Sequence, residues 1–420
     1  MTSERIIIAG LDIGSAKTTA VIGQAVPADG KNASYLRILG VGQARTTGLR
    51  RGIVSDIEET TRSIKKAIED AERMAGVKVD AIHVGIAGEH VRAMISKGIV
   101  AVNGEEISKA DVDRANEVAR AQPVPQDREL LHAIPQEYSV DKNQGIRDPI
   151  GMIGTRLETE MYLVTIGASP AMNLRKAVER AGYQIREMVL EPLASALSVL
   201  TEDEKELGVA LVEMGAGTTD IAVFHEGKIR YLGTVNYGGN NVTSDIVQGI
   251  GVTQADAERL KERFGCAYEP LVDPNEVLQL PSTVAQGDRQ IPREVLAHII
   301  HQRMDEIFNL ALDEIQRAGF AQRLNGGVVI TGGAAAMQGV AELAADVFGT
   351  GVRIGQPEEN LGGLSDAVQA PRFATVVGLA LYGAHRMAAN FATNGRGRAL
   401  AGVGVDRFTK RIKTWLEDFF

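Results

Sequence analysis

Two segments of the chain carry the same pattern of residue types, and that pattern could bind the phosphate groups of a ligand. LDIGSAKTTAVIG begins at Leu11 and VEMGAGTTDIAVF begins at Val212. Each places an acidic residue, an apolar residue, a glycine and a small residue before a Thr-Thr pair that runs into a strand. A glycine in a tight turn lets backbone N–H groups approach phosphate oxygens, because no Cβ is in the way. Two copies in matching contexts predict two similar halves that face each other.

The side chains of the two turns suggest separate roles. Asp12 and Glu213 would repel a phosphate unless a hard cation lay between, so we expect Mg²⁺ held largely through water. Lys17 would place a positive charge beside the β- and γ-phosphates. The other residues expected to contact phosphate are Gly14, Ser15, Thr18, Gly215, Gly217, Thr218 and Thr219. A single such turn is most often only a hairpin, and the sequence around Lys17 is not a P-loop, so the prediction depends on the repetition.

A third glycine turn occurs in VVITGGAAAMQGVAEL, where Gly332 and Gly333 end a strand and open a helix. Close approach of the backbone at this point would suit the sugar and ring of adenosine. Turns of this kind between a strand and a helix are common, so this segment supports a nucleotide site only together with the other two.

The elements that must position these turns alternate between strands and helices. Strands are expected at RIIIAGLDIG, TTAVIGQAV and YLRILGVGQA, and again at VALVEMGAG, TTDIAVFHEG and KIRYLGTVNYG. A helix is expected from Ser55, with Glu58 as its capping-box partner and Gly76 at its end. Short strands around one helix, from about His83 to Tyr162, predict a small α+β insert, after which MYLVTIGA resumes the first half.

In this order and spacing the three turns resemble the actin/Hsp70/sugar-kinase ATPase superfamily, which implies ATP as the ligand. YGGNNVTSDI, with Gly238 and Gly239, is similar to the superfamily's Gly-Gly turn. By the same resemblance, Glu258 and Lys261 in AERLKERFG would contact the ribose and adenine. Glu191 in EPLASALSVL stands at the position where related proteins carry a water-orienting acid. VVGLALYGA matches the superfamily's closing hinge helix.

Within that superfamily the chain resembles the FtsA family of bacterial cell-division proteins over nearly its whole length. The most specific segments are GLRRGIVSDIE, LLHAIPQEYSVD, GIRDPIGMIGTRLE, LTEDEKELGVALVEMGAGTTDIAVF and SDIVQGIGVTQADAERLKERFGCA. Two features depart from the family pattern: Glu213 stands where Asp is common, and some relatives lack an acid like Glu191. The two departures bear on the rate of ATP hydrolysis in opposite directions, and not on nucleotide binding. The resemblance implies that any hydrolysis uses water oriented by Glu191 or Glu213 and is slow, which leaves enzymatic activity open.

The resulting fold class is α/β: two actin-like (RNase H-like) halves around a nucleotide cleft, with an inserted small α+β subdomain and a C-terminal amphipathic helix. The expected domains are half I at 1–83 and 163–206, the insert at 84–162, half II at 207–238 and 321–370, a helical subdomain of half II at 239–320, a closing hinge helix at 371–387, a flexible linker at 388–404 and a membrane-targeting helix at 405–420.

The last segment, VDRFTKRIKTWLEDFF, is predicted to lie in a membrane interface. On a helical projection its apolar residues share one face: Val405, Phe408, Ile412, Trp415, Leu416, Phe419 and Phe420. Basic residues, including Lys410, Arg411 and Lys413, occupy the other side. Nearby acids balance them, so insertion of the apolar face must dominate and a single helix would bind reversibly. The alternative is a terminal helix docked on the protein's own core.

Composition excludes several classes of protein. Hydrophobic residues make up 44% of the 420 residues and charged residues 24%, which excludes disorder over most of the length. A net charge of -9 makes a broad nucleic-acid interface unfavourable. The single cysteine, Cys266, excludes a disulfide scaffold or a thiolate zinc cluster, and no apolar stretch is long enough to span a bilayer.

The family resemblance implies an ATP-binding protein that polymerises and anchors the FtsZ ring to the inner face of the cytoplasmic membrane at the division site. It implies that the FtsZ C-terminal peptide docks on residues 239–320, and that the insert meets neighbouring subunits and later division proteins. The alternative is a soluble phosphotransferase of the same superfamily with a docked tail. A chaperone is disfavoured because no substrate-binding domain follows the two halves.

Overall fold

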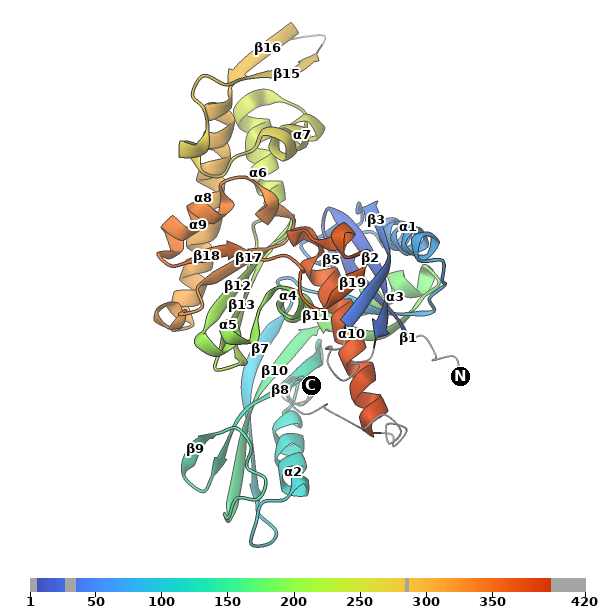
Figure 1. Cartoon of the computed structure of the whole chain (residues 1–420), viewed down its shortest axis with the longest axis vertical. Helices are drawn as coiled ribbons and strands as arrows, with labels where there is room; N and C mark the ends of the chain where they lie inside the picture. Colours follow the sequence, from blue (N-terminus) through green and yellow to red (C-terminus); the bar gives the residue numbers. More distant parts are fainter. Residues whose placement is uncertain (1–5, 27–34, 284–286, 394–420) are drawn as a thin grey trace.

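The computed structural model describes residues 6–26, 35–283 and 287–393. Two α/β halves lie side by side in the middle of an elongated molecule, with an inserted sheet at one end and a β-hairpin at the other (Figure 1). The predicted linker after residue 393 and the predicted membrane-targeting helix at 405–420 lie outside the described residues. Among the described helices, none is long and apolar enough to cross a membrane.

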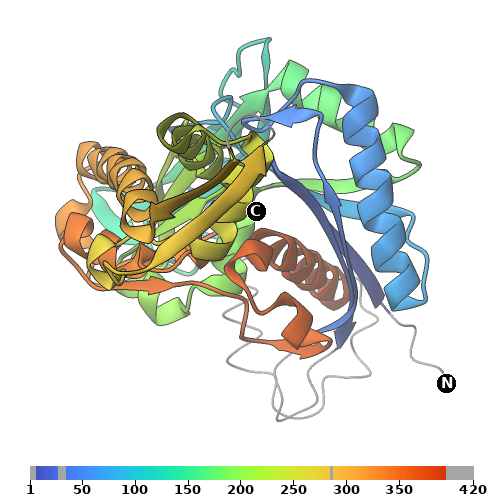
Figure 2. The same ribbon diagram turned by 90° about the horizontal axis from the view of Figure 1, so that it is seen from above.

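In the described residues the first half is built on a six-stranded sheet of order β11-β6-β1-β2-β3-β19. Its strands are β1 (Ile6–Ile13), β2 (Lys17–Val26), β3 (Tyr35–Arg45), β6 (Ala81–Ile86), β11 (Gln184–Leu190) and β19 (Leu361–Gly363). The first three are antiparallel, and β6 runs parallel to β1. Helices α1 (Ile57–Ala75) and α3 (Ala168–Arg180) cover one face, and α10 (Ala374–Thr393) covers the other (Figure 2).

Helix α1 begins one residue later than the sequence indicated. The expected cap was Ser55 with Glu58, but Asp56 caps the helix, and its side chain accepts a hydrogen bond from the Glu59 N–H at 3.0 Å. The backbone N–H of Ser55 instead donates to Gly48 O, which keeps Ser55 in the preceding turn. The predicted stop is confirmed, because Gly76 ends the helix in the left-handed conformation.

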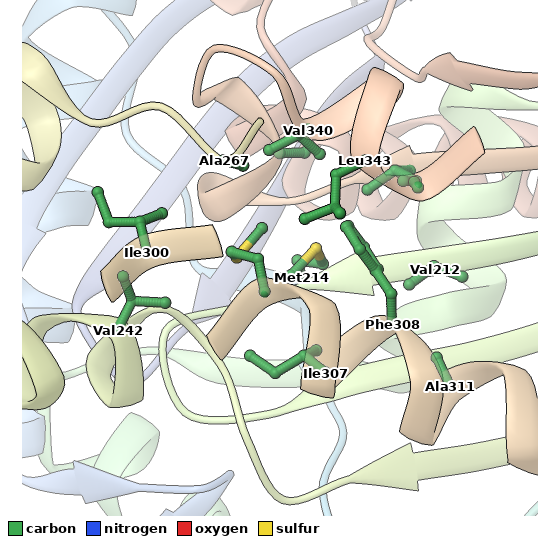
Figure 3. Close-up of a cluster of buried hydrophobic side chains, with 14 of the residues drawn as sticks. Val212, Met214, Val242, Ala267, Ile300, Ile307, Phe308, Ala311, Val340 and Leu343 are labelled. Carbon is green, nitrogen blue, oxygen red and sulfur yellow. The ribbon is translucent and has the colours of Figure 1, made fainter. Parts of the chain in front are cut away.

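The second half repeats the arrangement of the first. Its described residues form a five-stranded sheet of order β14-β13-β12-β17-β18. The strands are β12 (Val209–Met214), β13 (Thr219–His225), β14 (Lys228–Val235), β17 (Val328–Thr331) and β18 (Val352–Ile354), and again three antiparallel strands lead into a parallel neighbour. Helices α8 (Arg293–Arg317) and α9 (Val340–Phe348) pack on this sheet through Phe308, Ile307 and Leu343 (Figure 3).

The insert is a four-stranded sheet with one helix, as expected for a small α+β unit. Its strands β7 (Arg92–Ala101), β10 (Arg156–Gly167), β8 (Arg128–Val140) and β9 (Asn143–Ile146) lie in that order, beside α2 (Lys109–Arg120). The segment MYLVTIGA was expected to resume the first half, yet it forms the end of β10 and pairs with β7 and β8. The base of the insert packs on helix α4 (Glu191–Val199) and on the back of the second sheet.

The predicted helical subdomain, 239–320, also contains a β-hairpin that the sequence did not indicate. Helix α6 (Gly239–Ile246), a π-helical turn and α7 (Gln254–Phe264) come first. Strands β15 (Val277–Thr283) and β16 (Gly287–Pro292) then project at the tip of the molecule, before α8 returns to the sheet (Figure 1).

Two smaller elements complete the description. The hairpin β4 (Leu49–Arg50) and β5 (Ile53–Val54) precedes α1, and α5 (Glu202–Leu207) follows α4.

Helix α10 differs from the expectation at its end, because it continues to Thr393 where a flexible linker was predicted from residue 388. The sequence AANFAT explains the difference, since alanine has the strongest helix propensity of any residue.

Candidate functional site

The two predicted phosphate turns have the same backbone structure. Gly14 N–H donates to Lys17 O at 3.1 Å, and Gly215 N–H donates to Thr218 O at 2.9 Å. Lys17 of the first turn therefore corresponds to Thr218 of the second, and the two Thr-Thr pairs are one residue out of step. The repeat indicated by the sequence is therefore present in the backbone, with Gly14 and Gly215 at corresponding positions.

The strand registers identify an acidic residue that the sequence analysis missed. Asp12 pairs with Thr19 across β1 and β2, whereas Glu213 pairs with Asp220 across β12 and β13. Asp220 therefore takes the place in the second half that Thr19 has in the first. The sequence did contain a signal for Asp220: in TTDIAVF an acidic residue directly precedes the apolar residues of a strand. A buried charged residue is uncommon without a special role.

The two turns meet where the halves face each other. A Cβ placed on Gly217 would lie 2.7 Å from Ser15 Oγ, which is closer than real Cβ contacts come. A side chain at position 217 would therefore displace the Ser15 hydroxyl from this contact. This contact brings Ser15 and Gly217, which lie far apart in the sequence, to one point in the cleft.

Two of the hydroxyls predicted to contact phosphate, those of Thr18 and Thr219, form hydrogen bonds inside the protein instead. Thr18 is buried, and its hydroxyl bonds with the Thr46 hydroxyl at 2.8 Å and donates to the Ser63 hydroxyl at 3.1 Å. Thr219 is also buried and donates to Tyr237 O at 2.9 Å. Both hydroxyls therefore have partners inside the protein, so the backbone N–H groups and Ser15 are the better placed donors for a ligand.

Four further predicted residues converge on the second turn. Gly239 N–H donates to Gly215 O at 3.0 Å, and a Cβ on Gly238 would lie only 2.6 Å from the same carbonyl. Lys261 Nζ donates to Gly239 O at 3.0 Å and to Glu258 Oε2 at 2.8 Å. The start of α6 and one face of α7 are thus fixed against the turn.

The third glycine turn lies against the same strand end. Gly332 has a φ of 90°, and a Cβ on it would lie 2.5 Å from Met214 O, so only glycine fits at this position. A Cβ on Gly333 would meet nothing within 4 Å, so its surroundings are open. A single 3₁₀ turn at Gly333–Ala336 follows, in place of the helix expected to start directly.

Four carboxyl groups lie between the halves, Glu213 and Asp220 buried and Asp12 and Glu191 half-buried, and loss of water around them is the main cause of their raised pKa values. Burial and the neighbouring Glu213 raise the pKa of Asp12 to about 7. Burial raises the pKa of Glu213 to about 7 and that of Asp220 to about 6. Burial, then Asp12, Glu213 and Asp220, raise the pKa of Glu191 well above its usual value. A cation at this point would offset the shared negative charge.

Glu213 is held by both helices that pass between the halves. Its carboxylate accepts hydrogen bonds from Ser195 Oγ of α4, at 2.8 Å, and from Thr375 Oγ1 of α10. The two hydroxyl oxygens lie 3.1 Å apart, so both stand beside the same carboxylate. Neither was predicted to belong to the site, because a hydroxyl in an apolar helix gives no sequence signal of what it faces.

Glu191 and Lys17 take up different positions relative to this cluster. The Glu191 side chain lies over Gly85 of β6, where a Cβ would come within 2.8 Å of Glu191 Cγ. Lys17 lies at the mouth of the cleft, with Nζ 3.9 Å from Glu262 Oε1 of α7 and both side chains more than half exposed. Lys17, the basic side chain of the first turn, thus links the two halves at their outer edge through Glu262.

The geometry fits a phosphate ligand accompanied by a hydrated divalent cation. The turns offer backbone N–H groups around glycines whose Cβ positions are filled by neighbours, with buried carboxyls behind them. In the described part of the chain, no cluster of three or more His, Cys, Asp or Glu side chains could ligate a metal directly. Mg²⁺ usually binds through one or two carboxylates, water and phosphate oxygens, and Asp12 and Glu213 would supply the carboxylates here.

Comparison with known proteins identifies the family. A sequence model of the cell-division protein FtsA matches residues 210–378, and one of the SHS2 domain inserted in FtsA matches residues 88–165. FtsA of Pseudomonas aeruginosa is 39% identical over 99% of this chain and 98% of its own length. FtsA of Neisseria meningitidis is 40% identical over the full length of both, and that of Escherichia coli is 37% identical over 100% and 99%. The chain belongs to the FtsA family.

Solved structures place this FtsA-family chain in the actin-like fold. The PilM–PilN complex of type IV pilus biogenesis matches with a TM-score of 0.63 at 16% identity, over 91% of this chain and 99% of that one. MreB5 of Spiroplasma citri bound to AMPPNP matches with a TM-score of 0.53 at 14% identity, over 94% and 100%. The predictions of family, of two actin-like halves and of an inserted subdomain are therefore confirmed.

Proposed function

We propose that this member of the FtsA family binds Mg–ATP between the two halves and uses it to control assembly at the membrane. The observation that carries the proposal is the meeting of the two glycine turns at Ser15 and Gly217, with Asp12 and Glu213 behind them. MreB5 of the same fold has been solved with ADP and with AMPPNP, which supports a nucleotide as the ligand.

Each group of cleft residues has a distinct task in this proposal. The N–H groups of both turns, with Ser15, hold the phosphates, and Asp12 and Glu213 hold Mg²⁺ through water. Glu258 and Lys261 contact the ribose, with the adenine between them and the Gly332–Gly333 turn. Mg²⁺ would neutralise the phosphate charge and favour ionised carboxyls. Ionised Glu191 or Glu213 could then orient a water molecule, and any hydrolysis would be slow.

Closure of the cleft would link nucleotide binding to polymer formation. ATP bridges the two turns only when the halves are close, so it favours the closed state by its differential affinity for the two states. We propose that the closed state forms a polymer of this chain, with the insert meeting neighbouring subunits and later division proteins. The subdomain 239–320, which projects with β15 and β16 at one end of the molecule, would receive the FtsZ C-terminal peptide (Figure 1).

The proposed attachment to the membrane depends on the tail at 405–420, whose apolar face includes Phe408, Trp415 and Phe419. One such helix binds a bilayer weakly, but many tails on one polymer bind far more tightly through avidity. The proposal therefore joins the cleft to the tail: ATP promotes the polymer, and the polymer strengthens attachment at the inner face of the cytoplasmic membrane.

Co-sedimentation with anionic vesicles tests this link. The full chain, a chain ending at Gly404 and a Trp415→Glu variant are each spun with vesicles, with and without Mg–ATP. We expect Mg–ATP to increase pelleting of the full chain only, since the other two lack the apolar face. An Asp12→Ala variant, with its tail intact, should lose the nucleotide effect. If every chain stays in the supernatant, the membrane role is wrong and a soluble phosphotransferase becomes the better hypothesis.

A further inference from the structure

The tip of the β4–β5 hairpin has an unusual backbone. Its two central residues, Arg51 and Gly52, have φ angles of 49° and 76°. A two-residue hairpin turn with positive φ at both positions strongly favours Asn-Gly or Asp-Gly, because other side chains are strained there. Turn chemistry therefore does not account for an arginine at position 51. Strained positions of this kind often occur at functional sites.

A second hairpin in the same chain provides a comparison. Glu226 and Gly227, between β13 and β14, have φ angles of 56° and 76°. The Glu226 carboxylate, however, is paired with Arg230 at 2.8 Å on the protein surface. Across the described residues, the Arg51 guanidinium forms no hydrogen bond or ion pair, although its backbone is equally strained. Within the part of the chain that the structure describes, Arg51 therefore has a strained backbone and no side-chain partner that accounts for it.

The hairpin tip is locked beside both phosphate turns. The position that a Cβ would take on Gly217 lies 3.4 Å from Arg51 Cα and 2.7 Å from Ser15 Oγ. On its other side, a Cβ on Gly52 would lie 2.3 Å from Ala87 O, so the tip fits tightly against the end of β6. The backbone of Arg51 is thus fixed at the point where the two halves meet.

The charge of Arg51 matches what this point lacks. Lys17, the cation of the first turn, is 3.9 Å from Glu262 at the outer edge of the cleft. The side chains behind the turns are carboxyls. Beside the proposed Mg²⁺, a cationic side chain at a phosphate between Ser15 and Gly217 would add to its binding. The planar guanidinium of arginine binds phosphate oxygens in a bidentate manner, and it stays charged at every physiological pH.

We propose that Arg51 recognises the terminal phosphate of a nucleoside triphosphate held between the two turns, and so distinguishes a triphosphate from a diphosphate. This inference rests on the proposed nucleotide site. The strained backbone is retained because it holds the base of the arginine side chain beside Ser15 and Gly217. Arg51 would contribute to affinity for Mg–ATP and much less to affinity for Mg–ADP, whose phosphates end before this point.

The decisive variant is Arg51→Asn, because stability and binding should change in opposite directions. Asparagine tolerates the left-handed conformation, so the melting temperature without nucleotide should stay the same or rise. Loss of the charged hydrogen bonds should weaken Mg–ATP binding about tenfold or more. Binding of Mg–ADP should change by less than about threefold. Arg50→Asn is the matched control, since it removes the same charge from the neighbouring strand position, and it should leave both affinities near those of the wild type.

The outcomes separate this inference from the proposed function. A wild-type chain that binds neither Mg–ATP nor Mg–ADP would remove the nucleotide site and this inference with it. A wild-type chain that binds both, with an unchanged ratio of affinities in Arg51→Asn, would overturn the inference alone. Equal weakening by Arg50→Asn and Arg51→Asn would also overturn it, because a general effect of charge would then suffice. Partial recovery of Mg–ATP binding in Arg51→Lys would support it.

Discussion

His132 of the insert accepts a hydrogen bond on Nε2 from the backbone N–H of Leu190, at a distance of 3.0 Å. Leu190 is the last residue of β11 and precedes Glu191, so this bond ties the inserted sheet to the start of α4. Burial lowers the pKa of His132 to about 3, which keeps the imidazole neutral and able to accept. The insert is therefore joined to the acid proposed to orient water.

We expect His132→Leu to destabilise the protein by about 1–3 kcal/mol, because the Leu190 N–H would be left buried without an acceptor. Chemical denaturation without nucleotide measures this change. His90→Leu is the control, since both ring nitrogens of His90 are buried without a hydrogen-bond partner in the described structure. A loss of stability in His90→Leu as large as that in His132→Leu would contradict the assigned role of the bond.

The buried carboxyls predict that the nucleotide-free protein becomes less stable as the pH rises. Carboxyls of the unfolded chain titrate near 3.8 and 4.5, whereas those of Asp12 and Glu213 have a pKa of about 7 in the folded state. Between these values the folded state binds more protons than the unfolded state, so each increase in pH favours unfolding. Below about pH 6.5 buried histidines such as His132, whose pKa is lowered to about 3, act in the opposite sense. The carboxyls should therefore dominate above pH 7: melting temperatures measured in EDTA should fall from pH 7 to pH 8, and Mg–ATP should reduce the slope.

Glu191→Gln tests whether charge in this cluster limits stability. Because burial and three neighbouring acids raise the pKa of Glu191, its charged form is costly, and a neutral amide should stabilise the nucleotide-free protein at pH 8 by about 1–3 kcal/mol. Any ATP hydrolysis should fall at the same time. Glu262→Gln alters an exposed carboxylate and should change stability by less than about 1 kcal/mol. If Glu191→Gln lowers stability at pH 8, the carboxyl makes a favourable contact that outweighs its burial.

The parts of the site that the sequence predicted are those set by local backbone geometry. Gly14 and Gly215 could be found because each follows an acid by two residues in a tight turn, and Gly332 because it opens a Gly-Gly turn at the end of an apolar strand. Ser195 and Thr375 could not be found, since they reach Glu213 only through the crossing of two helices distant in the sequence. Pairing between β12 and β13, not the spacing of threonines, brought Asp220 beside Glu213.

The errors in the predicted fold have the same origin. Alternation correctly predicted that MYLVTIGA is a strand, but the sheet that a strand joins depends on non-local pairing, and β10 joins the insert. At the end of α10, the alanines of AANFAT favour a helix, whereas the whole segment 388–404 has the composition of a linker. A composition averaged over such a segment conceals the boundary within it.

Gly378 of α10 lies against Ala194 of α4, and a Cβ on it would lie 1.8 Å from Ala194 O. Helix propensity alone predicts that Gly378→Ala stabilises α10 by about 1 kcal/mol. The overlap predicts the opposite, because the helices must move apart and loosen the hydroxyls on Glu213. We expect a net loss of about 1–3 kcal/mol, measured by chemical denaturation. Gly351→Ala, where a Cβ would meet nothing within 4 Å, should change stability by less than about 0.5 kcal/mol. Equal stability of the two variants would mean that the crossing of α4 and α10 can widen freely.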